Sequence, residues 1–578
     1  MNGADILVRS LEDLQVKWVF GYPGAAILPV FHSLGGSSIG VMTSSNEQCC
    51  AFSAAGVSRA GDLVGVAVVT SGPAITNTLT AVADSNADSI PLLVFAGQVP
   101  SGKLGTDEFQ HIDVSRVFAR AAKKVILVSE THKIEEIVKD AYYFAKSGKP
   151  GPVVIDFPMD VQVGPSEYAG LDPEIFRQKY EDERHLSTNQ CKKFYDMLAE
   201  SKRPLLYIGG GLNNQAASDR IREFNRLFNI PSINSLMGKG ILDESLDTSL
   251  GMLGMYGTPY ANKAIQETDL FVGMGVRWDD RVAQKVGEAG LEADIAYIDI
   301  NPEKVQEVRV SRRPKFSFIG DAGTALKDLL AYACRNPVLV EISDWQHRVK
   351  TLKKEMALGY SRETSAIQQA AVMDILSELL PEDLRITTGV GNHQMLAAQY
   401  LKIRKPKSFL TSGGFGTMGF ALPCAIGAHL ADPTTNVLAI DGDGSLRMNM
   451  GELHTIGTRC LPIKVLLLNN HSSGMVRNIQ TSRYGGRTIA TEESCQQVRF
   501  SNIARECGFQ TALKVEQKSD LQSALETLLS TEGPAFLEVV TDIAEQVFPI
   551  IAPGKGYKDM DLGPFIKDAS NGATPEQA

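Results

Sequence analysis

Several features that would direct this chain to a membrane, to nucleic acid or to an oxidising compartment are missing from its sequence. Only 8 of its 578 residues are cysteine, no two of them are spaced as CxxC, and we expect all eight to be reduced thiols. No uninterrupted apolar run approaches about 18 residues, which argues against a transmembrane helix. There is no basic tract and the net charge is −10, which argues against a nucleic-acid partner. These absences predict a cytoplasmic protein without a membrane or nucleic-acid partner.

The composition is that of a globular protein. Hydrophobic residues make up 43% of the chain and charged residues 21%, values that are typical of soluble domains. At 578 residues the chain is too long for a single core, since domains average about 150 residues. The first residues, MNGADILVRSLEDL, have apolar positions at helical spacing. We therefore expect an amphipathic helix there, and neither a signal nor a transit peptide.

Apolar segments of strand length alternate with segments of helical spacing along most of the chain. This alternation is typical of α/β folds, and we predict three doubly wound parallel-sheet domains at residues 1–165, 187–335 and 365–550, followed by a partly disordered tail at 551–578. The first and third domains look like two copies of one plan. The stretches 158–186 and 336–363 read as linkers. We expect strands at residues 18–20, 64–70, 92–96, 153–156, 204–208, 270–273, 295–300 and 463–468.

The most informative stretch runs from Asp441 to Asn470. An apolar run ends at Ile440, an acidic glycine-rich turn follows, and a helical segment opens at about Met448. A second apolar run then ends in Asn469-Asn470. The pattern predicts a strand, a loop, a helix and a strand, and in an open parallel sheet ligands bind at the carboxyl ends of the strands.

The polar residues at these two strand ends suit a metal diphosphate. Asp443 supplies a hard carboxylate, Asn470 an amide oxygen and Ser472 a backbone carbonyl, a set that fits Mg²⁺ or Ca²⁺ and not zinc. Gly442 and Gly444 would let the backbone approach a phosphate closely. Taken alone, the sequence Asp-Gly-Asp-Gly could be no more than a tight turn.

Two further stretches have both a structural and a functional interpretation. Glu47 directly precedes a predicted helix over Cys49–Ala60, where the helix dipole favours an acidic residue. If the same carboxyl is shielded from water, it can hold a proton at neutral pH and serve acid–base chemistry. The stretch Gly413–Gly419 is either a glycine-rich turn with a core methionine or part of a ligand site.

Six motifs together resemble the catalytic subunit of acetolactate (acetohydroxyacid) synthase, a family of thiamine diphosphate-dependent enzymes, and the resemblance covers nearly the whole chain. The motifs are GTDEFQ (105–110), GMLGMYG (251–257), GVRWDDRV (275–282), SGGFGTMGF (412–420), GDGS…MGELHTI and LNN…GMVR. The resemblance implies a transferase of the branched-chain amino acid pathway that decarboxylates pyruvate and adds the resulting hydroxyethyl carbanion to a second 2-oxo acid. It also implies a homodimer or tetramer with active sites between subunits, with or without a small regulatory subunit.

The resemblance assigns roles at the cofactor to individual residues. Glu47 would share a proton with the pyrimidine ring, the Gly416 carbonyl would receive the 4′-amino group, and Met418 would hold the cofactor bent. Asp443, Asn470 and Ser472 would hold Mg²⁺. The other residues expected at thiamine diphosphate are Pro23, Gly24, Thr70, Asn77, Gly391, Asn392, His393, Gln394, Gly442, Gly444, Ser445, Met475 and Val476.

The resemblance extends to the substrate pocket and to the middle domain. Phe109 and Gln110 would line the reaction pocket, and Arg277 would meet the carboxylate of the acceptor. The middle domain resembles an FAD-binding domain, although a triple glycine after a strand is also an ordinary strand-to-helix turn. The flavin would be structural, because the reaction needs no redox step. The expected FAD-binding residues are Gly209, Gly210, Gly211, Gly251, Met252, Arg277, Asp279, Arg281, Asp299 and Asp321.

Several pocket positions depart from the pattern of the family. Asn46, Met159, Tyr256, Gly389 and Ile479 stand where a histidine, a lysine, a histidine, an acidic residue and a tryptophan are usual. An intact cofactor site beside an altered pocket favours a specialised carboligase with a changed acceptor, although drift at tolerant positions would leave the same pattern. A 2-oxo acid decarboxylase or oxidase of the same superfamily, or a non-catalytic regulatory paralogue, are the alternatives.

Overall fold

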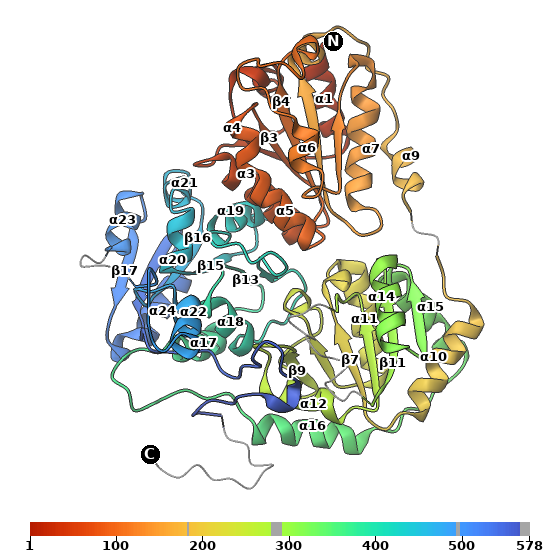
Figure 1. Ribbon diagram of the computed structural model, residues 1–578, viewed down its shortest axis with the longest axis vertical. Coiled ribbons are helices and arrows are strands. Elements are labelled where there is room, and N and C mark those ends of the chain that lie inside the picture. Colours follow the sequence, from red (N-terminus) through yellow and green to blue (C-terminus); the bar gives the residue numbers. More distant parts are fainter. Residues whose placement is uncertain (182–183, 279–291, 493–497, 567–578) are drawn as a thin grey trace.

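The computed structural model describes residues 1–181, 184–278, 292–492 and 498–566 (Figure 1). Within these ranges the chain forms three α/β domains, each built on a six-stranded sheet. All the strand pairings of the three sheets are parallel. The N-terminal domain lies at the top of Figure 1, the middle domain at the lower right and the C-terminal domain at the lower left. This arrangement confirms the predicted fold class.

The N-terminal sheet has the strand order β2-β1-β3-β4-β6-β5. Its central strands are buried along their whole length and rich in Val, Leu and Ala, as parallel strands covered on both faces are. The strands are β1 (Trp18–Tyr22), β2 (Gly40–Met42), β3 (Gly65–Val69), β4 (Leu92–Gln98), β5 (Lys124–Leu127) and β6 (Pro152–Pro158). The helices are α1 (Gly3–Asp13), α2 (Leu28–Leu34), α3 (Glu47–Ala60), α4 (Pro73–Asn77), α5 (Leu79–Ala87), α6 (Val114–Phe118), α7 (Ile134–Lys146), α8 (Met159–Val163) and α9 (Pro173–Lys179).

The middle sheet has the order β12-β11-β10-β7-β8-β9. Read from β9 and renumbered along the domain, this is the 3-2-1-4-5-6 order of dinucleotide-binding folds, whose ligand crevice lies between the first and fourth strands. Here those strands are β7 and β10. The strands are β7 (Pro204–Ile208), β8 (Ser232–Asn234), β9 (Ser249–Met252), β10 (Leu270–Met274), β11 (Asp294–Asp299) and β12 (Phe316–Ile319). The helices are α10 (Thr188–Glu200), α11 (Gln215–Phe228), α12 (Pro259–Glu267), α14 (Pro302–Arg312), α15 (Ala322–Arg335) and α16 (Ser343–Glu355).

The C-terminal sheet has the order β14-β13-β15-β16-β18-β17, the same order as the N-terminal sheet, which confirms that the two domains share one plan. The strands are β13 (Arg385–Thr388), β14 (Phe409–Leu410), β15 (Val437–Gly442), β16 (Ile463–Asn469), β17 (Thr511–Val515) and β18 (Ala535–Val540). The helices are α17 (Gln369–Leu379), α18 (Asn392–Tyr400), α19 (Ala421–Ala431), α20 (Asp443–Met448), α21 (Glu452–Thr458), α22 (Gly474–Arg483), α23 (Phe500–Glu506) and α24 (Lys518–Ser530).

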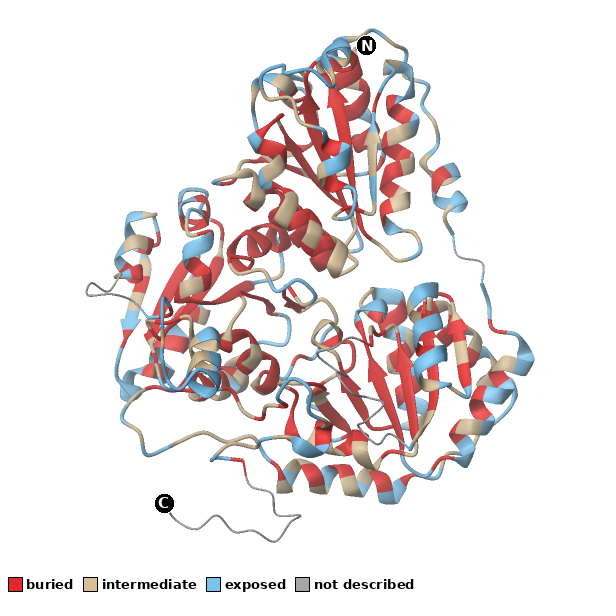
Figure 2. Ribbon diagram, viewed as in Figure 1, coloured by how far each residue is buried: buried red, intermediate tan, exposed pale blue. Residues whose placement is uncertain are grey.

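Helix α3 of the N-terminal domain packs against helix α19 of the C-terminal domain, and one hydrophobic core runs through both. The two helices touch through glycine: a Cβ on Gly427 would lie 1.8 Å from the Ser53 carbonyl oxygen. The Phe52 and Phe420 rings meet edge to face at 5.5 Å. Figure 2 shows both helices as buried as the sheets they cover. The two domains are therefore firmly joined within one chain.

Both segments predicted as linkers contain helices. The segment 158–186 contains α8 and α9, and α9 begins after Asp172, whose carboxylate accepts the Glu174 N–H at 2.9 Å. The charged segment 336–363 contains α16. Its polar residues face solvent, while Trp345 is buried and donates its ring N–H to the Pro204 carbonyl at 2.9 Å. The charged residues of this segment therefore form the solvent-exposed face of an amphipathic helix.

The helix expected at about Met448 begins five residues earlier, at Asp443, and a second helix follows as α21. The prediction was wrong because the glycine-rich turn itself forms the first helical turn. Among the described residues no helix is long and apolar enough to cross a membrane. The cysteines within the described ranges are all free thiols.

Candidate active site

The metal-ligand candidates lie together at the carboxyl edge of the C-terminal sheet. Strands β15 and β16 are neighbours, with Gly442 paired to Leu468, so the residues that follow them meet at one edge. Asp443 is the first residue of α20 and is 2% exposed. The Asn470 side-chain oxygen accepts the backbone N–H of Ser472 at 3.2 Å. The structure thus brings the predicted carboxylate, amide and carbonyl donors to one place.

Helix α18 directs its N-terminus at the same edge. Asn392 and Asn470 converge there, since a Cβ on Gly474 would lie 2.8 Å and 2.7 Å from their side-chain nitrogens. The Asn392 side-chain oxygen is buried and has no hydrogen-bond partner among the described residues. The N-terminus of a nine-residue helix with a buried, unsatisfied amide beside it fits the diphosphate of a metal–diphosphate ligand.

The His393 ring lies directly against Gly442, the last residue of β15. A Cβ on Gly442 would lie 2.7 Å from the His393 Nδ1 atom, so glycine is required there. Burial lowers the pKa of His393 to about 3, and the ring is neutral at physiological pH. Its Nε2 atom lies 3.6 Å from the Asp441 carboxylate, whose pKa burial raises to about 7. The pair lines the inner wall of the site.

The loop Ser412–Gly419 approaches this edge from the other side. Gly416 has φ +72°, a conformation that favours glycine, and a Cβ there would meet nothing within 4 Å. A Cβ on Gly444 would lie 3.5 Å from the Met418 terminal methyl carbon, so the Met418 side chain reaches the glycine turn. The Gly419 N–H donates to the Ser445 hydroxyl at 2.9 Å. Gly416 and Met418 therefore belong to the same site as Asp443.

The N-terminal candidates gather at the carboxyl edge of their own sheet. Asn46 caps α3 by accepting the Cys49 N–H at 2.9 Å, which fixes Glu47 in the first helical turn. Asn77 donates to the Glu47 carboxylate at 2.8 Å. A Cβ on Gly24 would lie 2.4 Å from the Thr70 methyl carbon. Pro23 precedes this contact and, like Asn77, is exposed.

The reaction-pocket candidates also belong to the N-terminal edge. Gln110 lies against the glycine turn that opens α4, because a Cβ on Gly72 would meet the Gln110 Cβ at 2.8 Å. The Ser71 hydroxyl contacts the Gln110 side-chain oxygen at 3.5 Å. Phe109 is 83% exposed, which is unusual for phenylalanine. An aromatic side chain in this setting has a surface available for another molecule or chain.

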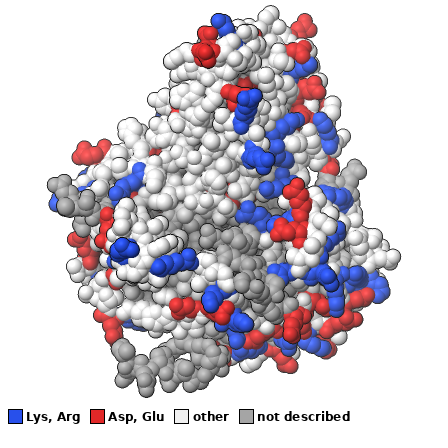
Figure 3. Space-filling view, in the orientation of Figure 1, with Lys and Arg blue, Asp and Glu red and all other residues white. Residues whose placement is uncertain are grey.

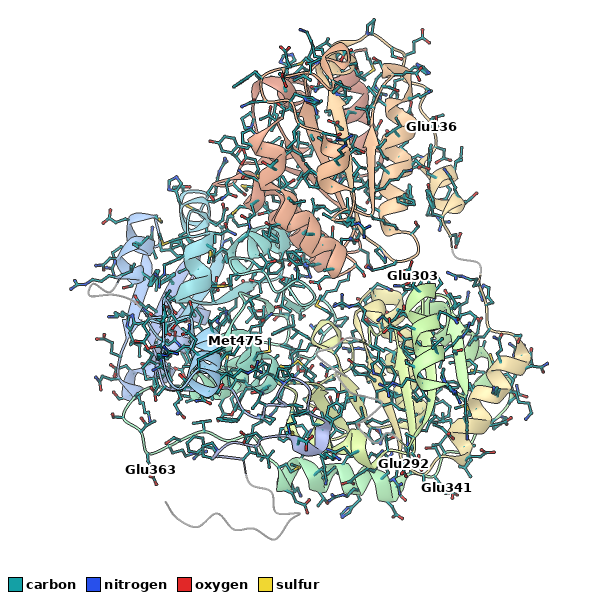
Figure 4. All side chains as sticks on the ribbon, in the orientation of Figure 1. Glu136, Glu292, Glu303, Glu341, Glu363 and Met475 are labelled. Carbon is teal, nitrogen blue, oxygen red and sulfur yellow. The ribbon has the colours of Figure 1, made fainter. Side chains whose placement is uncertain are left out.

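These two groups of residues are well separated within one chain. In Figure 1, α4, which carries Asn77, lies on the outer side of the upper domain, whereas α22 lies far below it in the C-terminal domain. Met475, in the first turn of α22, is labelled in the C-terminal domain in Figure 4. Glu47 lies in α3 of the N-terminal domain and Asp443 in α20 of the C-terminal domain, and these regions are linked by the Ser45 N–H, which donates to the Glu452 carboxylate at 2.7 Å.

The middle domain has its own candidate site, at the switch point between β7 and β10. The loops after these two strands touch through glycine, with the Gly211 N–H bonded to the Gly275 carbonyl at 3.0 Å. Gly251 has φ +71°, and Met252 is buried. Glycine loops that pack this closely at the topological switch point of a sheet fit the pyrophosphate group of a dinucleotide.

Two acidic candidates of the middle domain have different environments. Asp299 ends β11, is buried, and has its pKa raised to about 6 by that burial. The Asp321 carboxylate caps α15 by accepting the Thr324 N–H at 2.7 Å, so part of its role is structural. Asp279 and Arg281 lie outside the described residues.

Arg277 extends from the middle domain to both other domains. Its guanidinium donates to the Ala87 carbonyl at the end of α5. A Cβ on Gly414 would lie 2.7 Å from the Arg277 Nη2 atom, so the guanidinium also lies against the cofactor loop. The structure therefore places Arg277 at the junction of the three domains, between the two candidate cofactor sites.

Three family models match the chain. They describe the N-terminal TPP binding domain, the central domain and the C-terminal TPP binding domain of thiamine pyrophosphate enzymes, and they match residues 1–117, 191–329 and 389–539. The acetolactate synthase large subunit of Cyanidium caldarium is 37% identical over 97% of this chain and 96% of its own length. The isozyme 2 large subunit of Escherichia coli K12 is 36% identical, covering 97% and 99%. The chloroplastic enzyme of Arabidopsis thaliana is 37% identical, covering 97% and 84%.

The chain belongs to the acetolactate synthase large-subunit family. It is a thiamine diphosphate-dependent, acetolactate synthase-like carboligase, which confirms the predicted family, enzyme class and general activity.

The structure describes the surroundings of the positions where this acetolactate synthase-like chain departs from the family pattern. Asn46 is the N-cap of α3. The Tyr256 carbonyl accepts a hydrogen bond from the Gln399 side chain at 3.0 Å. A Cβ on Gly389 would lie 1.8 Å from the Asp441 carboxylate, so no side chain fits there as the structure stands. Met159 opens α8, and Ile479 is 41% exposed on α22.

Sequence reasoning missed Lys149, which lies beyond α7 in the N-terminal domain. Burial lowers its pKa, and the charges that act on it next are Arg277, Glu303 and Asp299 of the middle domain. Glu303 lies where the middle domain faces the N-terminal domain (Figure 4). Lys and Arg side chains are frequent in the same part of the face drawn in Figure 3. Only a fold can show that a lysine of one domain faces the dinucleotide-binding edge of another.

A cavity of about 400 Å³ lies elsewhere, between the C-terminal segment and the outer face of the C-terminal domain. Tyr360, Tyr400, Phe548 and Phe565 form aromatic walls around it. The predicted site residues are not among its lining residues. The cavity is therefore separate from the candidate active site.

Proposed function

We propose that the chain decarboxylates pyruvate and joins the resulting two-carbon unit to a 2-oxo acid or related carbonyl acceptor, with thiamine diphosphate and Mg²⁺ held by the C-terminal domain. The observation that carries the proposal is the convergence of Asp443, Asn470 and the N-terminus of α18 at one sheet edge. Asp443, Asn470 and the Ser472 carbonyl would hold Mg²⁺, since all three offer oxygen ligands. Bound thiamine diphosphate supplies the carbanion chemistry that both steps need.

The N-terminal and C-terminal domains would bind different parts of the cofactor. We assign pyrimidine binding to residues 1–165 and diphosphate binding to residues 365–550. The Gly416 carbonyl would accept a hydrogen bond from the pyrimidine amino group, and the Met418 side chain would hold the cofactor in its bent conformation. Both residues lie in the loop Ser412–Gly419, and a Cβ on Gly416 would meet no atom within 4 Å, so there is open space beside this glycine.

Glu47 would hold a proton at the pyrimidine ring nitrogen. Its carboxylate is half-buried and hydrogen-bonded to Asn77 in one chain. A second chain that covered it would exclude water and favour the protonated form. The chemistry needs this proton because the ring can lose a proton at its amino group only while the opposite nitrogen carries one.

The separation of Glu47 from Asp443 supports a site shared between two chains. Five apolar side chains near the two halves are exposed by 41% to 83%, and exposed apolar surface is typical of places where another chain binds. They are Phe109, Phe415, Met448, Val476 and Ile479. We therefore propose a homodimer as the smallest active unit, with Glu47 of one chain facing Asp443 of the other.

The middle domain, residues 187–335, would hold FAD as a structural cofactor. The 3-2-1-4-5-6 strand order and the glycine contacts between the loops after β7 and β10 support it. Gly209, Gly210 and Gly211 would face the pyrophosphate, with Arg277 and Lys149 as the nearby cations. Purified protein should carry FAD that is released on denaturation and identified by its absorbance. Its absence after reconstitution would contradict this assignment.

The altered pocket supports a specialised acceptor. Ile479 in place of tryptophan frees volume on α22, and Met159 and Tyr256 remove a positive charge and an imidazole. The relatives are named large subunits, and a small regulatory subunit for this chain is a further proposal. Co-purification of a smaller chain from the native source would support it.

Replacing Glu47 by Gln tests the assigned chemistry. The amide keeps the hydrogen bond to Asn77 but cannot exchange a proton, so we expect pyruvate-dependent CO₂ release to fall at least about 100-fold. The unfolding midpoint should stay close to that of the wild-type protein. Glu136→Gln, on the same domain at α7 and away from the site (Figure 4), is the matched control. Unchanged turnover in Glu47→Gln would reject the role of this carboxylate.

A further inference from the structure

The cofactor loop Ser412–Gly419 is fixed at its far end by its own domain. The Gly419 N–H donates to the Ser445 hydroxyl at 2.9 Å, and the Gly419 carbonyl accepts the Asn449 side-chain amide at 2.9 Å. Gly419 also has φ +84°, which favours glycine. These bonds tie the loop to the α20 region of the C-terminal domain.

Two carboxylates of the N-terminal domain hold the same loop on both sides of its tip. Asp88 accepts the backbone N–H groups of Gly413 and Gly414, at 3.0 Å and 2.6 Å. Asp84 accepts the Ser412 hydroxyl, and it accepts the Thr417 hydroxyl at 2.9 Å. Both acids lie within one turn of each other at the end of α5, so a single helix end contacts the loop at four residues.

Arg59 pairs with both carboxylates. Its guanidinium lies 2.7 Å from Asp84 and 2.9 Å from Asp88, and the three side chains are no more than 2% exposed. It also donates to the Thr411 carbonyl, directly before the loop, at 2.9 Å. Buried charges persist only when they are paired and hydrogen-bonded. Each of these three side chains is paired, and of the Arg59 nitrogens only Nε has no partner among the described residues. We call Arg59, Asp84 and Asp88 the clamp.

Between its two fixed ends the loop is open. Gly414, Phe415 and Gly416 are exposed, and Met418 is half-buried beside Gly444. The tip is therefore held before Phe415 by Asp88, and after Gly416 by the bonds of Thr417 to Asp84 and of Gly419 to Ser445. Because the tip carries the Gly416 carbonyl, a small shift of the clamp would change where that carbonyl points.

We propose that Asp84 and Asp88, paired with Arg59, are positioning residues for catalysis: from the N-terminal domain of the same chain they hold the loop so that the Gly416 carbonyl and the Met418 side chain meet the cofactor. This inference rests on the proposed function, since it concerns the same thiamine diphosphate site. The residues touch neither substrate nor cofactor and act through the loop.

Helix α3 carries both Glu47 and Arg59 and so connects the clamp to the proposed proton-holding carboxylate. Glu47 stands in its first turn and Arg59 in its last, and a helix of 14 residues spans about 20 Å. In a dimer with shared sites, Glu47 serves one site while Arg59 positions the loop of the other. One rigid helix, packed against α19 along its length, therefore connects the two active sites.

Thr417→Val tests the clamp with the smallest change. It removes the hydroxyl that donates to Asp84 and leaves the ion pair with Arg59 in place. Isothermal titration of the apoprotein with thiamine diphosphate in the presence of Mg²⁺ should show a Kd raised by about tenfold, the effect of losing one hydrogen bond to a charged group. The kcat should fall while the KM for pyruvate changes little, because substrate does not touch the loop anchor.

Two variants control for a purely structural effect. Thr417→Ser keeps the hydroxyl and should restore the wild-type Kd. Thr387→Val removes a buried hydroxyl bond of the same domain, to the Ala421 carbonyl, outside the clamp. It should leave the Kd and the near-ultraviolet circular dichroism of bound cofactor unchanged, whereas Thr417→Val should alter that spectrum.

The outcomes separate the two proposals. Wild-type affinity, kcat and spectrum in Thr417→Val would overturn the clamp while leaving the proposed function intact. So would a loss of affinity that only follows a lowered unfolding midpoint of the apoprotein. A wild-type protein that binds no thiamine diphosphate would overturn the proposed function itself, and the clamp with it. Asp88→Asn, which keeps the size of the side chain, should raise the Kd in the same direction as Thr417→Val.

Discussion

At the scale of the residue, burial can outweigh hydrogen bonding in setting the pKa of an acidic side chain. Glu545 is an example outside the active site. Its carboxylate caps α17 by accepting the N–H groups of Gln369 and Ala370 at 2.5 Å and 3.0 Å. Burial nevertheless raises its pKa to about 7, and Asp542 adds to the rise. A helix cap in this protein therefore titrates near neutral pH.

This raised pKa predicts a pH-dependent stability. The folded state binds a proton at Glu545 between about pH 4.5 and 7 and the unfolded state does not, so its stabilising effect is present at low pH and is lost as pH rises through 7. The free energy of unfolding of the wild-type protein, relative to Glu545→Gln, should be greater at pH 5 than at pH 8 by roughly 2 to 3 kcal/mol. Urea unfolding at the two pH values measures it.

The control for this prediction is Glu526→Gln, on the exposed face of α24. It should show no comparable difference between pH 5 and pH 8. A relative stability of the wild-type protein that rises with pH would contradict the assignment, because it would mean that folding prefers the charged form of Glu545.

Residue types and their spacing indicated most of the candidate site. Asp443 and Asn470 could be identified because both follow apolar runs at the ends of neighbouring strands, and their meeting follows from parallel topology. The clamp could not be identified in this way, because Arg59, Asp84 and Asp88 are ordinary helix residues in the sequence. Their role depends on the packing of α5 against a loop more than 320 residues later in the chain.

At the scale of the element, the eight strand ranges that were predicted coincide with observed strands, whereas several edge strands and the helices next to polar segments were not predicted. Buried parallel strands are continuous apolar runs, so their positions are visible in the sequence. In α16 only Trp345, Val349 and Leu352 are buried, and they are separated by charged residues that suggested a linker. The turn before α20 was misplaced because glycine usually ends a helix, whereas here Gly442 and Gly444 lie at the start of one.

At the scale of the whole molecule, Glu47 and Asp443 belong to different domains of the chain, and the proposed function requires them to meet in one active site. The firm contact between α3 and α19 fixes the N-terminal and C-terminal domains relative to each other (Figure 2). A hinge that would bring Glu47 to Asp443 of the same chain would have to break this shared core. A second copy related by two-fold symmetry can supply the missing half at each site.

The shared site predicts complementation between inactive variants. Glu47→Gln lacks the proton-holding carboxylate, and Asp443→Ala lacks a metal ligand, so each should have little activity alone. In a mixed dimer one site receives Glu47 from one chain and Asp443 from the other, and random exchange of subunits should restore roughly a quarter of wild-type activity. The two proteins are mixed, exchanged and assayed for CO₂ release. Mixtures no more active than either variant would indicate sites built within single chains.

The most direct test of the account is the product that the protein makes from pyruvate. Purified protein with thiamine diphosphate, Mg²⁺ and FAD is incubated with pyruvate alone and with a panel of 2-oxo acids and aldehydes, and the products are identified by mass spectrometry. The account predicts CO₂ release together with a ligated product, and faster ligation with an acceptor other than a second pyruvate or 2-oxobutanoate. Rapid formation of acetolactate from pyruvate alone would contradict the specialised acceptor, and free acetaldehyde or oxygen consumption without ligation would contradict the carboligase.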